Sequence, residues 1–158
     1  MREIKFRAWF TKDKAMAHVD KLEFNESYRN SPVHADVWAK TDFEKGGWYT
    51  PLRAATNRKT VVDGSKEQVP RVVLMQYTGI DSENGVEIFE GDIVKQEETL
   101  FGVVDTDLEI TGVVKMLEGC WVIDSGEDSV HLWSETACNQ ILGNIYETSE
   151  LMEVEANA

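Results

Sequence analysis

The sequence predicts a mostly β protein, on the basis of two observations. Short apolar runs of strand length recur along the second half of the chain at a regular interval, which is typical of a barrel or sandwich rather than of βαβ units. Turn signals separate these runs, above all the pairs Asn84-Gly85 and Glu118-Gly119. Such pairs tolerate the positive φ that tight hairpins require.

The N-terminal residues predict a β-hairpin. Ile4, Phe6 and Ala8 alternate with Lys5, Arg7 and Trp9, which is the period-two pattern of a strand with one apolar face. Residues 15–19 form a second short apolar run after a turn. Residues 25–68 are rich in Asn, Ser, Pro, Gly and charge, so we expect an irregular insertion with one short helix or hairpin, and a loop over residues 57–66.

The stretch from Val72 to Lys95 carries the strongest local signal in the chain. An apolar run leads to Gly79, an acidic loop holds Asn84-Gly85, and alternating residues then lead to Gly91. We therefore predict a hairpin over residues 72–93 with Asn84-Gly85 in its turn. Gly79, Gly85 and Gly91 are the candidate turn glycines, and at least one of them should have positive φ.

The rest of the chain predicts a second β region. Strand signals occur at residues 93–94, 101–104, 111–116, 120–123, 130–133 and 140–146, with Gly or acidic turns between them. We expect two parts, residues 1–70 with the N-terminal strands and the insertion, and residues 71–158 as an acidic β domain.

The net charge of −13 is unevenly distributed. Residues 1–70 hold 13 Lys and Arg against 10 Asp and Glu, whereas residues 71–158 hold 3 against 19. Because nucleic-acid binding draws on clustered Lys and Arg, the C-terminal half is an unfavourable nucleic-acid binder.

Length and cysteine use favour a cytoplasmic protein. A chain of 158 residues can bury a sizeable core without disulfides, and Cys120 and Cys138 show no CxxC spacing. No secretory leader is recognisable, and no apolar run approaches the roughly 20 residues of a membrane helix. We expect no membrane association.

Aromatic and basic residues gather in the N-terminal half and define a candidate interaction surface. Its residues are Lys5, Arg7, Trp38, Trp48 and Tyr49. Single-stranded nucleic acid would use such residues for stacking and phosphate contacts. The competing interpretation, which we favour, is that the aromatic side chains pack the insertion onto a sheet.

No catalytic or cofactor motif occurs. Asp105, Asp107 and Glu109 alternate as in a calcium loop, but Ile110 and Met116 stand where the required Gly and bidentate Glu would be.

Other candidate catalytic groups lack a motif. Glu87, Glu90 and Asp92 could supply a carboxylate pair only if the fold buries them together. His131 could meet Cys120 or Cys138, although neither cysteine has a motif context. We therefore predict no enzyme activity, no catalytic residue, no metal and no cofactor.

Three ordered blocks resemble one known family. They are IKFRAW at residues 4–9, LMQYTG with the Asn-Gly loop and EIFEGDIV at residues 74–94, and ILGNIYE at residues 141–147. Residues 1–147 resemble one unit of the YopX family, which phages and prophages encode. The family usually has Asp after the Trp of the first block, where this chain has Phe10. The resemblance implies an all-β fold whose C-terminal part is a small SH3-like barrel, and no particular reaction.

These observations leave several functions open. The leading hypothesis is a non-enzymatic phage or prophage accessory protein that binds a host or phage protein in the bacterial cytoplasm. The alternatives are single-stranded nucleic-acid binding by the insertion, a metal-dependent hydrolase around Asp92, and a DNA mimic built on the acidic half. We also expect a homo-oligomer, with a dimer favoured, in which strand Ile4 to Trp9 of one copy meets the acidic surface of another.

Overall fold

A computed structural model describes residues 3–25, 34–41, 51–62, 64, 66–100 and 103–148, leaving out the side chains of residues 25, 34, 41, 99, 100 and 103–108. All regular secondary structure within these ranges is β-strand, which confirms the mostly β prediction. None of the described residues forms a helix that could cross a membrane. The chain divides into an N-terminal unit, residues 5–76, and a C-terminal unit, residues 77–158 with residues 1–4.

The N-terminal unit is built on an antiparallel sheet in the order β4-β3-β2-β1-β7. Its strands are β1 (Phe6–Phe10), β2 (Ala15–Asn25), β3 (His34–Thr41), β4 (Pro51–Ala55) and the first half of β7 (Val72–Asp81). One face of the sheet is apolar because alternate residues on its strands are apolar, most of them small or aliphatic. Its buried centre consists of Ala8, Phe10, Ala17, Val37, Ala39 and Val72. The predicted hairpin of β1 and β2 is confirmed.

The prediction of an irregular insertion over residues 25–68 is wrong for most of the part that the structure describes. β3 and β4 pair as the one hairpin that was allowed for, but they extend the sheet beyond β2, and β5 (Lys59–Val61) pairs with β6 (Gln68–Pro70) where a loop was expected. The apolar face of β3 is made of Ala35, Val37 and Ala39, and its two alanines are small residues with weak strand propensity. Their alternation is regular, but each residue contributes little hydrophobic signal.

The predicted hairpin over residues 72–93 is confirmed, since β7 pairs antiparallel with β8 (Glu87–Phe89). Gly85 lies in the turn, where its N–H donates to the carbonyl of Ser82 at 2.9 Å. Gly79 does not end the strand as expected, because β7 continues through a register shift to Asp81. β7 pairs with β1 before Tyr77 and with β8 from Tyr77 on, so the two units divide inside this strand, whereas the sequence predicts a division after residue 70.

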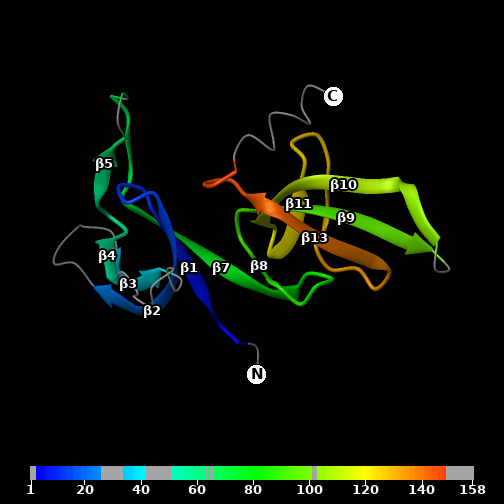
Figure 1. The fold of residues 1–158 in the computed structure, drawn as a ribbon, viewed down its shortest axis with the longest axis horizontal. Coiled ribbons are helices and arrows are strands. Elements are labelled where there is room, and N and C mark those ends of the chain that lie inside the picture. The colour runs from blue at the N-terminus through cyan, green and yellow to red at the C-terminus, as the bar shows by residue number, and fades with distance from the viewer. Residues whose placement is uncertain are drawn as a thin grey trace, which may run out of the picture. The chain divides into compact units, whose positions relative to one another are not determined.

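The C-terminal unit contains an antiparallel sheet in the order β12-β11-β10-β9-β13 (Figure 1). The strands are β9 (Asp92–Leu100), β10 (Val103–Leu117), β11 (Cys120–Asp124), β12 (Ser129–His131) and β13 (Ala137–Asn144). β9 and β10 are the long ribbons of this unit in Figure 1, and β13 runs along β9. The buried core consists of Ile88, Val94, Val114, Ile123 and Leu132.

This sheet is open. β12 and β13 stand at opposite ends of the strand order, and no strand pairing joins them among the described residues. The closed SH3-like barrel that the family resemblance implies is therefore not confirmed. Side chains rather than a strand ladder connect the β12 end to β9 and β13, and these contacts shape the candidate site.

Candidate functional site

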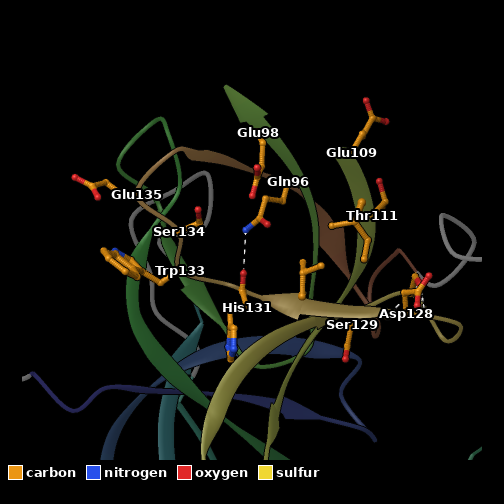
Figure 2. A pocket seen from close by; sticks show the side chains of 13 residues that line it. Gln96, Glu98, Glu109, Thr111, Asp128, Ser129, His131, Trp133, Ser134 and Glu135 are labelled. Carbon is orange, nitrogen blue, oxygen red and sulfur yellow. Dashed lines mark hydrogen bonds between the residues drawn. The ribbon is translucent and has the colours of Figure 1, made fainter. Parts of the chain in front are cut away.

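A groove of about 940 Å³ lies in the C-terminal unit, beside the edge strand β12 (Figure 2). β9 and β10 contribute one wall, and the turn before β12, β12 itself and the segment after it contribute the other. The lining residues are Gln96, Glu98, Glu109, Ile110, Thr111, Ser125, Asp128, Ser129, Val130, His131, Trp133, Ser134 and Glu135.

A buried amide network fixes the segment that follows β12. The side-chain amide of Gln96, 4% exposed, donates to the carbonyls of His131 at 3.2 Å and Leu132 at 3.1 Å, and to Oδ1 of Asn139 at 2.9 Å. Nδ2 of Asn139 donates to the same Leu132 carbonyl at 2.9 Å. These bonds hold β12 against β9 and β13 without strand pairing, because buried amides strongly favour satisfied geometries.

The turn that leads into β12 is equally well fixed. The main-chain N–H and the hydroxyl of Ser125 both donate to the carbonyl of Asp128, at 2.9 and 3.0 Å. The N–H of Gly126, which has φ of 93°, donates to Oδ1 of Asp124 at 2.6 Å. β12 is therefore a short strand anchored at both ends.

Exposed apolar side chains stand beside this rigid strand. Trp133 is 67% exposed and Val130 is 36% exposed. Ile110 adds a half-buried aliphatic side chain that packs against the core. Figure 2 shows Trp133 with Glu135 at one end of the groove and Ser129 with Asp128 at the other. A solvent-exposed indole at a hollow lined by polar groups is a common feature of binding surfaces.

The charge of the groove has one sign. Its lining contains the carboxylates of Glu98, Glu109, Asp128 and Glu135 and no Lys or Arg. Residues 77–158 contain only two basic residues of this kind, Lys95 and Lys115, against 19 Asp and Glu. Both are occupied, since Lys95 pairs with Glu97 at 2.7 Å and Glu109 at 3.0 Å, and Lys115 pairs with Asp124. Hydrogen bonding to Glu97 and then to Glu109 raises the pKa of Lys95.

The three candidate turn glycines have positive φ, with values of 84° at Gly79, 73° at Gly85 and 82° at Gly91. Gly85 and Gly91 lie in turns, and Gly79 lies at the irregularity inside β7. The N–H of Gly91 donates to the carbonyl of Val114 at 2.8 Å, which joins this turn to the core strand β10. These positions are structural and do not line the groove.

The candidate surface of the N-terminal half is only partly assembled in the described residues. Trp48 and Tyr49 lie outside them. Lys5 and Arg7 are half-buried near or in β1, which is flanked by β2 and β7 and is not a sheet edge. β1 is therefore not an exposed strand edge, because both of its edges are already paired, and the expected dimer stays a prediction.

Two cations lie over the ring of Trp38. This residue pairs in register with Lys21 on β2 and with Arg53 on β4, and both cationic groups lie 4.6 Å from the ring centroid. The two cations therefore come from the strands on either side of β3. A nucleobase that stacks on Trp38 would compete with them for the ring.

The residues considered for catalysis stay apart or serve the fold. Asp92 is 1% exposed and accepts a hydrogen bond from the N–H of Phe89 at 2.8 Å, which fixes the turn before β9. Glu87 and Glu90 are half-buried. The segment 105–109 lies in strand β10, at a register shift, rather than in a loop. Among the described residues, no group of three or more His, Cys, Asp or Glu is placed to hold a metal ion.

The two cysteines are exposed thiols and form no disulfide. Cys120 and His131 line one smaller pocket of about 420 Å³ between β11 and β12 residues. Cys138 lines a separate pocket with Trp133.

Within the described residues the regular structure is all β, and an anionic groove lies at the edge of an open sheet. The chain belongs to the YopX family, because the family model described as "YopX protein" matches residues 5–153. Among solved structures, the chain is similar to the crystal structure of protein EF1440 from Enterococcus faecalis, with 23% identity and a TM-score of 0.43 over 96% of this chain and 99% of that one. No curated protein matches the sequence significantly.

The sequence predicted a strand at residues 130–133, whereas β12 spans Ser129–His131, and it missed Trp133 and Val130 as site residues. In the pattern Val-His-Leu-Trp, apolar residues alternate with His131 and Trp133 across the end of this short strand. That pattern was the available signal, and it becomes informative only once Leu132 is known to occupy the core.

Proposed function

We propose that the protein is a non-enzymatic interaction module and that the groove beside β12 binds a segment of another protein. The observation that supports this most is Trp133, which is 67% exposed at an anionic groove whose strand is anchored at both ends. Exposed indoles are expensive to leave in water and are enriched at binding hot spots. Rigid anchoring reduces the ordering cost of binding.

Resemblance to a family that phages and prophages encode supports the further proposal that this activity occurs in the cytoplasm of a bacterial cell that carries the phage or prophage. The partner is then a host or phage protein with a basic surface. A DNA mimic is a special case of the same proposal, in which the partner is a DNA-binding protein. The expected homodimer also remains a proposal, without the strand-edge contact of β1, and light scattering at low salt tests it.

Site-specific photo-crosslinking in bacteria tests the proposal. A benzophenone amino acid replaces Trp133 in one variant and Phe24 in a matched control, since Phe24 is 70% exposed but lies in the N-terminal unit. We expect a discrete crosslinked protein from the Trp133 variant that is absent from the Phe24 variant. Identical crosslinking patterns from both positions, or none from either, would contradict the proposal.

Single-stranded nucleic-acid binding by the N-terminal unit is the weaker candidate, because Lys21 and Arg53 already occupy the Trp38 ring. Titration of a labelled oligothymidylate at low salt tests it by fluorescence anisotropy. We expect no change. A saturable increase that Arg53→Ala abolishes would reinstate this candidate.

A further inference from the structure

The hydrogen-bond pattern of β12 determines which of its main-chain groups face the groove edge. The N–H of Leu132 donates to the carbonyl of Trp121 at 3.0 Å, and the N–H of Ser125 donates to the carbonyl of Asp128 at 2.9 Å. In an antiparallel pair, alternate residues direct both main-chain groups to the partner strand. Asp128, Val130 and Leu132 therefore face β11, and Ser129 and His131 direct their N–H and C=O groups away from it.

Most of these outward main-chain groups are available to pair with another strand. β12 is the end strand of its sheet, and Ser129, Val130 and His131 are all exposed. The outward carbonyl of His131 is taken by the amide of Gln96. No hydrogen bond within the described residues engages the outward N–H of Ser129, the outward C=O of Ser129 or the outward N–H of His131. Proteins commonly cover or charge such edges when nothing is meant to pair with them.

The surroundings of the edge define the chemistry of its occupant. Val130 and Ile110 offer aliphatic contacts, and Glu98, Asp128 and Glu135 offer negative charge without a Lys or Arg in the lining. An added strand alternates its side chains between two faces. One set of side chains would then meet the aliphatic residues, and basic side chains between or beside them would meet the carboxylates.

We propose that β12 is a strand-addition site for an extended, positively charged peptide segment of a partner protein. The inference rests on the proposed function and deepens it by specifying how the groove binds. Main-chain hydrogen bonds to Ser129 and His131 supply the pairing, and charge and the aliphatic contacts supply selectivity. The anchors at both ends of β12 keep the template extended before the partner arrives.

Amide hydrogen exchange tests the pairing directly. The probe is a peptide of about seven residues with alternating arginine and valine, long enough to span a three-residue strand with overhang. We expect saturating peptide to slow exchange at the outward N–H groups of Ser129 and His131 by about tenfold or more, since a single hydrogen bond of ordinary strength gives that factor. The N–H of Val130, which already faces β11, is the internal control and should change much less.

Peptide variants separate main-chain pairing from simple charge attraction. N-methylation at alternate residues removes the donors from one edge of the peptide. We expect one alternate set of methylations to weaken binding about tenfold and the other set to have little effect. Equal effects of the two sets, or peptide binding without slower exchange at Ser129 and His131, would overturn the strand-addition inference.

Charge selectivity has its own control pair. Glu135 lines the groove and Glu127 does not, yet both are exposed loop carboxylates of the same unit. We expect Glu135→Lys to weaken binding of the arginine-valine peptide several-fold more than Glu127→Lys, which changes the net charge equally. Equal losses would show that the whole acidic unit, and not the groove, attracts the peptide.

The outcomes distinguish this inference from the function on which it rests. A crosslinked partner at Trp133 combined with no peptide pairing at β12 would overturn strand addition and leave the interaction module in place. Pairing by an N-terminal segment of a second copy would appear as a dimer in the absence of peptide, and it would contradict a separate partner.

Discussion

The two units differ in how their charged side chains are paired. In the N-terminal unit, exposed basic side chains find partners within the same sheet, since Lys21 meets Glu23 at 2.8 Å, Lys40 meets Asp20 at 3.3 Å, and Arg53 lies over Trp38. Residues 77–158 of the C-terminal unit hold two lysines and no arginine against 19 Asp and Glu, and both lysines are paired. Several basic side chains of the N-terminal unit are thus complemented within their own sheet, whereas the C-terminal unit carries an excess of negative charge.

The strand edges show the same contrast. β1 of the N-terminal unit has neighbours on both sides, whereas β12 ends its sheet and directs main-chain groups into a groove. Pairing and neutralising a surface removes its capacity to attract a partner. Under the proposed function, the two sheets would have different tasks, one structural and one in recognition.

The largest expected effect comes from breaking the framework of the C-terminal unit at Gly112. A Cβ at this position would meet the carbonyl oxygen of Asp124, lie 2.5 Å from its carbonyl carbon and lie 2.8 Å from the nitrogen of Ser125. These are main-chain atoms, so Gly112→Ala should lower the free energy of unfolding by about 3 kcal/mol, the upper part of the range for overpacking. Urea denaturation measures it.

Gly119→Ala is the control for the Gly112 substitution. Gly119 has φ of 84° with open space around it, so an added methyl group there costs only conformational strain. We expect a loss of about 1 kcal/mol. Equal losses at the two positions would contradict close approach of the two strands at Gly112.

The next effect concerns the buried side-chain amide of Gln96, which connects β12 to β9 and β13 where no strand pairing does so among the described residues. Gln96→Leu keeps a similar volume but leaves the carbonyl of His131 and the amide of Asn139 without their partner. Stability should fall by about 2 kcal/mol because buried polar groups lose their hydrogen bonds. Faster amide exchange at Leu132 and its neighbours should accompany the loss. Unchanged exchange around β12 would show that the network does not hold this strand.

Substitutions of Trp38 in the N-terminal unit and of Trp133 in the C-terminal unit sharpen the comparison between the units. Trp38→Ala removes two cation–π contacts and should cost about 1 to 2 kcal/mol of stability. Trp133→Ala removes a side chain that is 67% exposed and should change stability by no more than about 0.5 kcal/mol. Partner or peptide binding should respond in the reverse order. A binding loss from Trp38→Ala alone would reverse the roles assigned to the two units.

The smallest expected effects are on the pH dependence of stability, and they have opposite signs for Glu23 and Lys95. The hydrogen bond from Lys21 lowers the pKa of Glu23, so this pair stabilises the fold above the ordinary glutamate pKa and loses that contribution as pH falls through the lowered value. The raised pKa of Lys95 has the opposite consequence. Its contribution is complete below the ordinary lysine pKa and is lost as pH rises through the raised value.

One substitution at each of these two residues tests whether its contribution to stability depends on pH in the expected direction. Glu23→Gln should reduce the acid sensitivity of stability, and Lys95→Met should reduce its alkaline sensitivity. Thermal unfolding at acidic, neutral and alkaline pH measures both. A loss of acid sensitivity from Lys95→Met would contradict the assignment.

Local turn chemistry explains which parts of the fold were predictable. Asn84-Gly85 and Glu118-Gly119 specify their hairpins because φ is positive at Gly85 and at both residues of the second pair. The pairing of β1 with β7 and of β9 with β13 joins segments far apart in the chain, and no local residue pattern encodes it. The strands within the predicted insertion were missed because Ala35 and Ala39 fill core positions with little hydrophobic signal.

The candidate site was less predictable than the fold. The excess of carboxylates was visible in the sequence, but the groove depends on Gln96, a polar strand residue whose importance comes from burial against the carbonyls of His131 and Leu132. Trp133 is exposed because Leu132, its neighbour, is the residue that enters the core. Both features depend on contacts between segments far apart in the chain rather than on any motif.

The most direct test of the different roles of the two units is the binding footprint of the arginine-valine peptide, measured by NMR chemical-shift changes across the whole chain. The account predicts changes concentrated at residues 96–98, 109–111 and 125–135, with the Lys21, Trp38 and Arg53 region unaffected, and a progressive loss of the changes as salt is raised. Changes centred on the N-terminal unit, or spread evenly over every acidic residue of the C-terminal unit, would contradict it.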